Sequence, residues 1–406
     1  MPPIYSWKAE FLAGKTKVVP MKVVSMPITR DFRTAYGDQI VLEIMIAAGD
    51  FVYDIYPNRQ NLLVTLSKEG RARGADAAAL AADIESQQFR AVLLDEHTSS
   101  VTVEGLLNIA HSKAALNTVD ILTIKFQLVD LALEQIRLHS VGGVFNDCTP
   151  AEVLNYVLTS VSTQLKLDES NTIKGVEMVT SPNTDKYKHI VVPHGTKFPD
   201  FPKFLHDKVG GLYSSGMGLY LFRQNWYVYP LYDLTRFEKS TKTLTLINLP
   251  TNQLPGIEWT YRKTANQTIA LVTGDVKHFD LTESKLLNEG NGVRYLDARQ
   301  VVDGFANTSD GENKAVVARA ENNNEFVTDE RADGLNNVMT SSSRITANKF
   351  GELSKLAQRT GAEIQCVWEN SDMGAIYPGM PVKFLYIKDD RVSELVGTVL
   401  GAEHYI

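Results

Sequence analysis

The stretch YPGMPVKFLYIKDDRVSELVGTVLGAEHYI, residues 377–406, guides the interpretation of the whole sequence. Two β-prone runs flank a turn signal at Asp389 and Asp390, so the stretch predicts a β-hairpin. The hairpin carries no catalytic motif. We therefore expect residues 377–406 to close a β-domain and to supply a structural element of the fold rather than a chemical one.

Length and composition set the broad class of the protein. A chain of 406 residues is too long for one compact core and predicts about two to four domains. Apolar residues make up 44% and charged residues 22%, as in soluble globular proteins. The net charge of −7 argues against general binding to nucleic acid phosphates.

The start of the sequence and its cysteine content predict folding in the cytoplasm. The start, MPPIYSWKAEF, lacks the basic head and apolar run of a secretory signal. No window approaches about 18 unbroken apolar residues, so we expect no membrane-spanning segment. Cys148 and Cys366 are too few for a disulfide framework, which indicates folding in a reducing compartment.

Residues 1–145 are predicted to form a first β-domain. A long strand with one apolar face is expected over residues 118–136, and an alanine-rich helix at 75–86 is expected between strands. Some strands are apolar on both faces, so either the chain's own helices or another subunit must cover them. Shorter β-prone runs lie at 39–50, 51–57, 61–67 and 89–94.

Residues 146–239 are predicted to form a mixed α+β domain. A helix at 149–165 is marked by Thr149 as the cap, Pro150 at the first helical position, and Glu152 completing a capping box. A second helix is expected at residues 198–209, stopped by two glycines.

An aromatic run at residues 218–233 predicts two strands around a turn at 223–225. One interpretation is the packed core of a hairpin, because aromatic residues favour strands. The other is a partner surface, because Trp and Tyr dominate interface hot spots. The candidate interface residues, including one from the closing hairpin, are Tyr220, Phe222, Trp226, Tyr227, Tyr229 and Phe384.

A second β-domain is predicted from residues 240–282 and 345–406. Residues 283–344, rich in Asn, Asp, Gly and Ser, interrupt it as an insertion domain or as long loops. Inside the second half, a helix is expected at residues 347–360. The expected strands lie at 242–250, 257–263, 268–279 and 362–368, followed by the closing hairpin.

Motifs for catalysis or cofactor binding are absent from the sequence. There is no P-loop, and the GMG at residues 216–218 lacks the third glycine of a dinucleotide fingerprint. The histidines are scattered without metal-ligand spacing. We therefore expect no enzyme activity, no catalytic residue, no cofactor and no metal site.

The order of the predicted domains and segments along the chain is similar to that of a known protein family. A β-domain is followed by the capped helix TPAEVLNYVL (149–158) and by the block KFPDFPKFLHDKVGGLYSSGMGLYLFRQNWYVYPLYD (197–233). An interrupted second β-domain then ends in IYPGMPVKFLYI (376–387) and LVGTVLGAEH (395–404). In this order the chain resembles the baseplate hub protein of contractile-tailed bacteriophages.

The resemblance implies an α+β, mostly β fold with two tail-tube-like antiparallel β-barrels. Three chains would form a pseudo-sixfold ring, a structural virion component that joins the hexameric tail tube to the trimeric central spike around the DNA channel. Its location would be the baseplate of the virion tail, after assembly in the host cytoplasm. The implied partners are further copies in a homotrimer, the tail tube or tube-initiator protein, the central spike protein, the tape measure protein and baseplate wedge proteins, with DNA as passing cargo.

Two other functions stay open at the level of sequence. One is a hub-like protein of another tail type or of a phage-derived secretion apparatus. The other is a cell-wall-degrading enzyme of the tail tip, which the missing acid, nucleophile and metal motifs disfavour. The mass in solution separates the hub from the cell-wall-degrading enzyme, because the hub requires a trimer.

Overall fold

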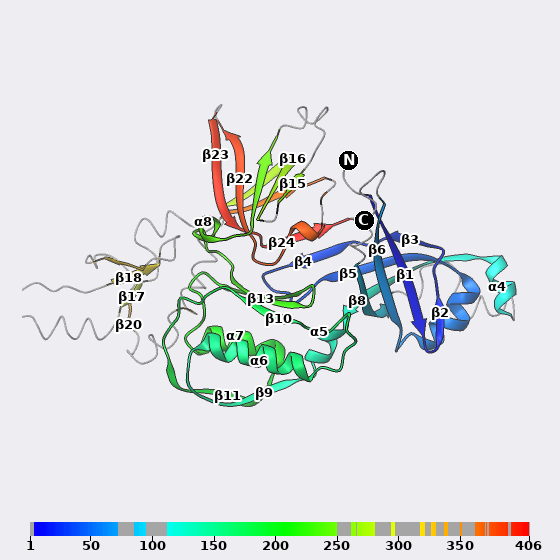
Figure 1. The fold of residues 1–406 in the computed structure, drawn as a ribbon, viewed down its shortest axis with the longest axis horizontal. Coiled ribbons are helices and arrows are strands. Elements are labelled where there is room, and N and C mark those ends of the chain that lie inside the picture. Colours follow the sequence, from blue (N-terminus) through cyan, green and yellow to red (C-terminus); the bar gives the residue numbers. More distant parts are fainter. Residues whose placement is uncertain are drawn as a thin grey trace, which may run out of the picture.

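The computed structural model describes a mostly β protein in which antiparallel pairing predominates (Figure 1). None of the described helices is long and apolar enough to cross a membrane. The residues described are 4–71, 85–94, 112–249, 261–264, 266–280, 294–296, 317–320, 326–329, 337–339, 350, 362–369, 371, 373–388 and 391–405.

The first β-region is one nine-stranded antiparallel sheet. Its order is β2-β1-β6-β7-β8-β5-β4-β24, with β3 on the side of β5. Alternate residues of β5 and β8 point into one core, as the period of two in the sequence predicts. The strands are β1 (Ile4–Ala13), β2 (Thr16–Val18), β3 (Lys22–Ser25), β4 (Ile28–Asp31), β5 (Gln39–Ala47), β6 (Leu63–Arg71), β7 (Glu85–Leu93), β8 (Ile121–Asp130) and β24 (Gly401–His404).

Residues 51–57 are helical, so the predicted strand there is wrong. The chain forms α1 (Ala48–Asp50), a π-helical turn (Phe51–Ile55) and a 3-10 turn (Tyr56–Asn58). These turns pack on α4 (Lys113–Val119), where the Asn117 side chain accepts a 3.0 Å hydrogen bond from the Asp50 N–H. This contact, together with burial of the apolar residues in the first core, outweighs their preference for strands.

Strand β8 also ends earlier than the sequence predicts. Residues 131–136 form the helix α5 (Leu131–Ile136) instead of continuing the strand. The Asp130 carboxylate accepts hydrogen bonds from the N–H groups of Ala132 (2.8 Å) and Leu133 (3.1 Å). Asp130 is therefore the N-cap that turns the chain from strand into helix.

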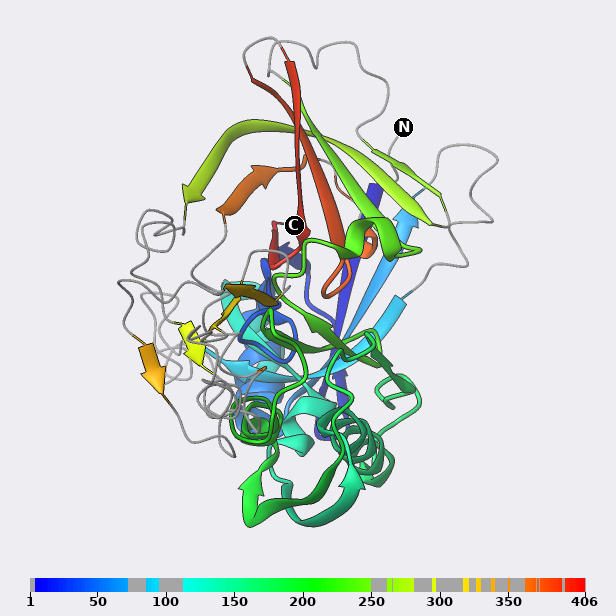
Figure 2. The same ribbon diagram turned by 90° about the vertical axis from the view of Figure 1, so that its left-hand side faces the viewer.

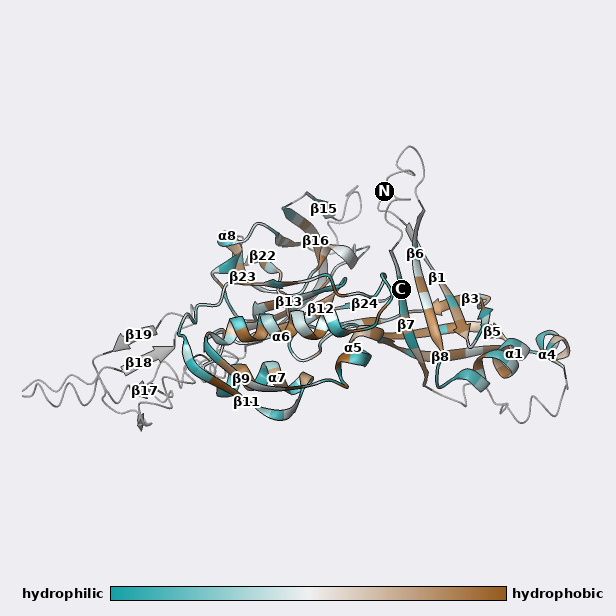
Figure 3. Ribbon diagram, turned by 60° about the horizontal axis from the view of Figure 1, so that its bottom comes forward, coloured by the Kyte–Doolittle hydropathy of each residue, from teal (hydrophilic) through white to brown (hydrophobic). Residues whose placement is uncertain are grey.

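The stretch predicted as a middle domain, residues 146–239, contains both helices and strands, and both of its predicted helices are confirmed. Helix α6 (Pro150–Gln164) begins with the expected capping box, in which Thr149 and Glu152 exchange hydrogen bonds of 2.8 and 3.2 Å. Helix α7 (Phe201–Lys208) is followed by two glycines with φ of 82° and 78°. Hydrophobic and hydrophilic residues alternate around α6 (Figure 3).

The two helices lie between two small β layers (Figure 1). One layer is the antiparallel ribbon of β9 (Ser140–Cys148) and β11 (Tyr187–Lys197). The other is the sheet β10-β13-β12, whose strands are β10 (Gly175–Met178), β12 (Met217–Phe222) and β13 (Asn225–Pro230). Apolar side chains from both layers and both helices form the second core.

The second β-region is a mixed sheet of order β15-β16-β14-β22-β23, with β21 paired to β16. The closing hairpin of β22 and β23 is confirmed, in unbroken register from Pro381 opposite Thr398 to Lys388 opposite Arg391. Unlike a barrel built from hairpins alone, the sheet places β14 parallel to both neighbours. Its strands are β14 (Thr243–Asn248), β15 (Tyr261–Lys263), β16 (Gln267–Asp280), β21 (Ala362–Val367), β22 (Pro381–Lys388) and β23 (Arg391–Thr398), preceded by α8 (Arg236–Lys239).

Parts of the chain between these elements are described only in pieces. Four short strands form a small sheet within the predicted insertion, in the order β19-β18-β17-β20. The predicted helix at 75–86 lies outside the described residues except for 85 and 86, which belong to strand β7 instead. Of the predicted helix at 347–360 only Phe350 is described. The four strands are β17 (Arg294–Leu296), β18 (Val317–Ala320), β19 (Phe326–Asp329) and β20 (Asn337–Met339).

The final strand does not stay in the second β-region. After β23 the chain returns to the first sheet, where β24 pairs antiparallel with β4 from Gly401 opposite Asp31 to His404 opposite Ile28. Figure 2 shows the C-terminus beside the first sheet. Among the described residues neither large sheet closes on itself by pairing its end strands, so the two barrels stay a prediction.

Candidate assembly interface

The aromatic hairpin of β12 and β13 has the predicted strands and turn. Leu219 faces Val228 and Tyr220 faces Tyr227 across the two strands. Arg223 and Gln224 form the turn with φ of 48° and 65°. Left-handed backbone at both turn positions matches the right-handed twist of the flanking strands.

The structure places the candidate interface residues mostly inside the chain. Tyr220, Phe222, Trp226, Tyr229 and Phe384 are buried, and Tyr227 is half-buried. Trp226 points into the core of the middle domain, where its indole N–H donates to the Ser162 hydroxyl at 3.1 Å. Phe384 is buried in β22 of the second sheet and is not brought together with the others. A role for these residues at a subunit interface stays a prediction.

The other face of the hairpin forms a cluster that we call the aromatic junction. Its aromatic rings touch three parts of the chain: the loop after β4, the hairpin, and the segments on either side of the closing hairpin. Its buried members are Phe32, Tyr220, Phe222, Tyr229 and Leu231, and half-buried members around them include Tyr227, Ile376, Tyr377, Val399 and Leu400.

Hydrogen bonds fix the aromatic junction. The Tyr229 hydroxyl donates to the Phe32 carbonyl at 2.7 Å, and the Phe32 N–H donates to the Leu400 carbonyl at 3.0 Å. The Phe32 ring meets the Tyr220 ring edge-on, with centroids 4.9 Å apart. One residue of the first region, Phe32, is thus bonded to both the middle domain and the C-terminal segment.

The close fit around Tyr229 requires two glycines. A Cβ atom on Gly218 would lie 2.2 Å from the Tyr229 ring, and one on Gly379 would also lie 2.2 Å from it. Gly379 in addition has a φ of 68°, which side chains disfavour. These two glycines allow backbone from two regions to lie directly against one aromatic ring.

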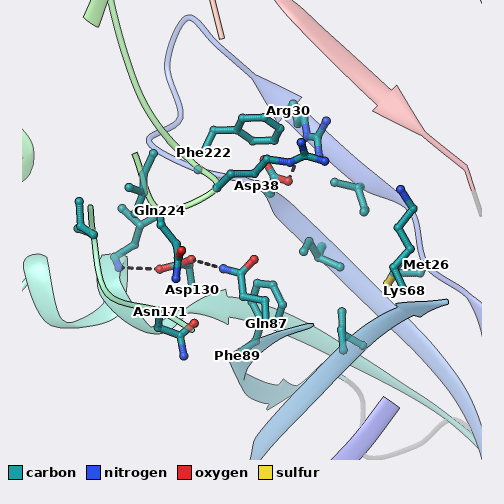
Figure 4. Close-up of a pocket in the computed structure, with 18 of the residues that line it drawn as sticks. Met26, Arg30, Asp38, Lys68, Gln87, Phe89, Asp130, Asn171, Phe222 and Gln224 are labelled. Atoms are coloured by element: carbon teal, nitrogen blue, oxygen red, sulfur yellow. Dashed lines mark hydrogen bonds and ion pairs between the residues drawn. The ribbon is translucent and has the colours of Figure 1, made fainter. Parts of the chain in front are cut away.

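Polar groups connect the same three regions beside the junction. Arg30 of β4 forms an ion pair with Asp38 at 3.1 Å, and its Nη1 lies 3.2 Å from Nε2 of His404. The Tyr220 hydroxyl donates to Asp38 at 2.8 Å, and the Arg30 guanidinium stacks on the Phe222 ring (Figure 4). Burial and the Asp38 carboxylate raise the pKa of Tyr220 well above its ordinary value.

A cavity of about 110 Å³ lies below this network, between the first sheet and the aromatic hairpin (Figure 4). Gln87 donates a 2.8 Å hydrogen bond to Asp130, and burial raises the pKa of the Asp130 carboxyl. The side-chain oxygen of Asn171, which also lines the cavity, has no hydrogen-bond partner within the described chain. The cavity wall is mostly apolar, and Gln87, Asp130 and Asn171 are among its polar side chains.

Metal-ligand groups are not gathered at this site or elsewhere in the described residues, where no cluster of three or more His, Cys, Asp or Glu side chains could hold a metal ion. Arg30, Asp38 and His404 were not among the site residues predicted from the sequence. No local pattern could have identified them, because Arg30 and His404 are 374 positions apart. The arrangement connects three regions of the chain through hydrogen bonds, an ion pair and aromatic packing.

Comparisons with known proteins give structural likeness at low sequence identity. The tail protein from Neisseria meningitidis MC58 has a TM-score of 0.48 at 10% identity, over 99% of this chain and 92% of that one. The 43 kDa tail protein of prophage MuSo2 from Shewanella oneidensis has a TM-score of 0.44 at 12% identity, over 99% and 93%. A Francisella PdpA–VgrG complex has a TM-score of 0.28 at 9% identity, over 68% and 44%. No family model and no curated protein sequence matches the chain.

Proposed function

We propose that the chain is a structural subunit of a phage tail baseplate, the homotrimeric hub that joins the hexameric tail tube to the trimeric central spike and surrounds the DNA channel. In this proposal each β-region is part of a tube-like barrel, so three chains offer six similar units to the tube. The sequence resemblance in the order of parts supports this assignment.

The observation that carries the proposal is the docking of β24 on β4. A protein that matches a sixfold ring to a threefold one needs two tube-like units held in a fixed relation. Strand β24 follows the second sheet directly and is hydrogen-bonded into the first. The aromatic junction adds side-chain contacts between the same regions. Together they give one polypeptide with two coupled β-regions.

The partners in this proposal are two further copies of the chain, the tail tube or tube-initiator protein, and the central spike protein. The tape measure protein and the baseplate wedge proteins are further candidates, and DNA is cargo that passes through the ring. We infer that the chain itself has no catalytic activity. We also infer that it is located in the virion tail after assembly in the host.

The mass of the purified protein tests this function. Light scattering after size exclusion should give three chains of 45.1 kDa each. The trimer, added to tail tube subunits, should shorten the lag before tubes form. A monomer that lyses cell walls would overturn the proposal in favour of a lytic enzyme. A trimer without effect on tube formation would contradict the role at the tube.

A further inference from the structure

The last strand of the chain brings a histidine against an arginine of the first sheet. Strand β24 pairs with β4, with His404 opposite Ile28 and Ala402 opposite Arg30. Residues two positions apart along a strand point to the same side, so His404 and Arg30 are diagonal neighbours on one side of the pair. Their side chains are buried, with 7% and 6% exposed, and Nη1 of Arg30 lies 3.2 Å from Nε2 of His404.

The chemistry of this contact fixes the protonation state of the histidine. A guanidinium group has five N–H donors and no acceptor, so Arg30 must donate and Nε2 of His404 must accept. An imidazole nitrogen accepts only when it carries no proton, so the ring is neutral and its proton is on Nδ1. A protonated ring would lose this hydrogen bond and place a second positive charge beside the first. The docked strand therefore excludes the extra proton.

The charged groups on the first sheet and the aromatic hairpin do not reverse this conclusion. Asp38 binds Nε of Arg30 at 3.1 Å and accepts from the Tyr220 hydroxyl at 2.8 Å, whereas Nη1 of Arg30 is the group that meets the ring. Lys68, which lines the same cavity as Arg30 and Asp38, is a second buried cation on that side. The polar group in direct contact with His404 is therefore a cation.

The acidic groups on the two paired strands point to the other side. Glu403 and Tyr405 are the immediate neighbours of His404, so their side chains alternate away from it, and the Tyr405 hydroxyl donates to Glu403 at 2.8 Å. Asp31 of β4 also points to that side and accepts from the Thr34 hydroxyl at 2.6 Å. Neither carboxylate is placed to neutralise a proton on the histidine.

We propose that His404 makes the docking of β24 on β4 an acid-sensitive switch, in which uptake of a proton by His404 releases the strand from the first sheet. A histidine in solvent binds its proton near about pH 6.5. Because the released strand binds one proton more than the docked strand, docking is complete above that pH and weakens by up to about tenfold per pH unit below it. The switch lies within one chain, so it does not depend on the trimer of the proposed function.

Hydrogen exchange tests the switch in the full chain. Mass spectrometry measures the protection of residues 400–405, corrected for the intrinsic exchange rate at each pH. Between pH 7.5 and pH 5.0 the protection should fall by about 30-fold, because pH 5.0 is about 1.5 units below the solvent value for histidine. In His404→Gln the side-chain oxygen accepts from Arg30 at either pH, so the fall should stay below about threefold.

Two further variants identify the cause of the change. Gly401→Ala should remove the protection at both pH values, because its Cβ atom would lie 2.6 Å from the Arg30 carbonyl oxygen. His189→Gln is the matched control, because His189 is an exposed residue of β11 bonded to Asn146 at 2.8 Å, and it should keep the full fall. A wild-type chain that stays protected at pH 5.0, or an equal fall in His404→Gln, would overturn the switch.

Nitrogen NMR of the histidine rings tests the same proposal without relying on docking of the glutamine variant. In protein labelled with ¹⁵N-histidine, the His404 ring, identified by its loss in His404→Gln, should carry its proton on Nδ1 alone at pH 7.5. The doubly protonated ring should appear on acidification only as the protection of residues 400–405 is lost. A doubly protonated ring in a segment that remains protected would contradict the proposal.

Discussion

The aromatic hairpin and the closing hairpin have the same construction and opposite surroundings. Both are antiparallel pairs of strands in unbroken register. Most of β12 and β13 is buried, and the hairpin contacts the first β-region, the middle domain and the C-terminal segment. Strand β23 is exposed or half-exposed along its whole length. Of the two interpretations of the aromatic run in the sequence, the structure shows the packed core of a hairpin.

The difference shows that a high content of aromatic residues indicates a packed surface. It does not indicate whether that surface lies within one chain or between two subunits. Tyr and Trp provide large apolar surfaces with a polar group that hydrogen-bonds at the edge. That combination serves the junction of three regions within one chain as well as it serves two subunits. Unpaired strand edges are a more direct sign of assembly, because their backbone groups have no partner in the described chain.

A charge at Phe384 should have the largest effect. Phe384 lies between Leu246 and Leu395 in the second sheet, so Phe384→Asp loses apolar contacts and buries an unpaired carboxylate. We expect the free energy of unfolding to fall by more than about 5 kcal/mol, measured by urea denaturation with circular dichroism. Val392→Asp on the same hairpin should change the stability of the single chain by less than about 0.5 kcal/mol. Soluble, unchanged trimers of Phe384→Asp would contradict this burial.

Truncation of Trp226 should have the next largest effect. Trp226→Ala opens a cavity in the middle core and should lower the free energy of unfolding by about 3–5 kcal/mol. Ser162 keeps its hydrogen bond to the Leu158 carbonyl at 2.6 Å, so the loss reports packing. Tyr156→Ala on the exposed side of α6 is the control and should cost less than about 0.5 kcal/mol. Equal losses for both variants would mean that the hairpin is less buried than described.

High pH should weaken the aromatic junction by a smaller amount. Burial, helped by Glu177, raises the pKa of Tyr227 to about 12, and burial raises that of Tyr377 to about 12. In the unfolded chain both hydroxyls ionise near pH 10. Their contribution to stability is therefore full below about pH 10 and is lost between about pH 10 and 12, by at most about 1.4 kcal/mol per pH unit for each tyrosine. Tyr227→Phe should reduce this slope, as measured by urea denaturation at pH 9 and 11.

Local signals in the sequence predicted the elements that local physics determines. The capping box at Thr149, the glycines after α7 and the turn at 223–225 each act within a few residues, and each element forms as predicted. The alternation along β8 likewise predicted its buried face.

Elements that depend on distant contacts could not be predicted in this way. Residues 51–57 have strand propensity but pack as helical turns against α4, about 60 positions further on. The network of Arg30 and His404 has no local pattern at all. The aromatic residues were identified, but whether they face another subunit or another part of the same chain is a matter of tertiary structure.

Because β24 lies near the C-terminus, the first sheet can be completed only at the end of synthesis. Arg30 leaves the ribosome 374 residues before His404, which at about 5–20 residues per second is a delay of roughly 20–75 s. During translation β4 therefore has no strand partner on the side that β24 later occupies. A chain truncated before residue 401 would lack this partner permanently.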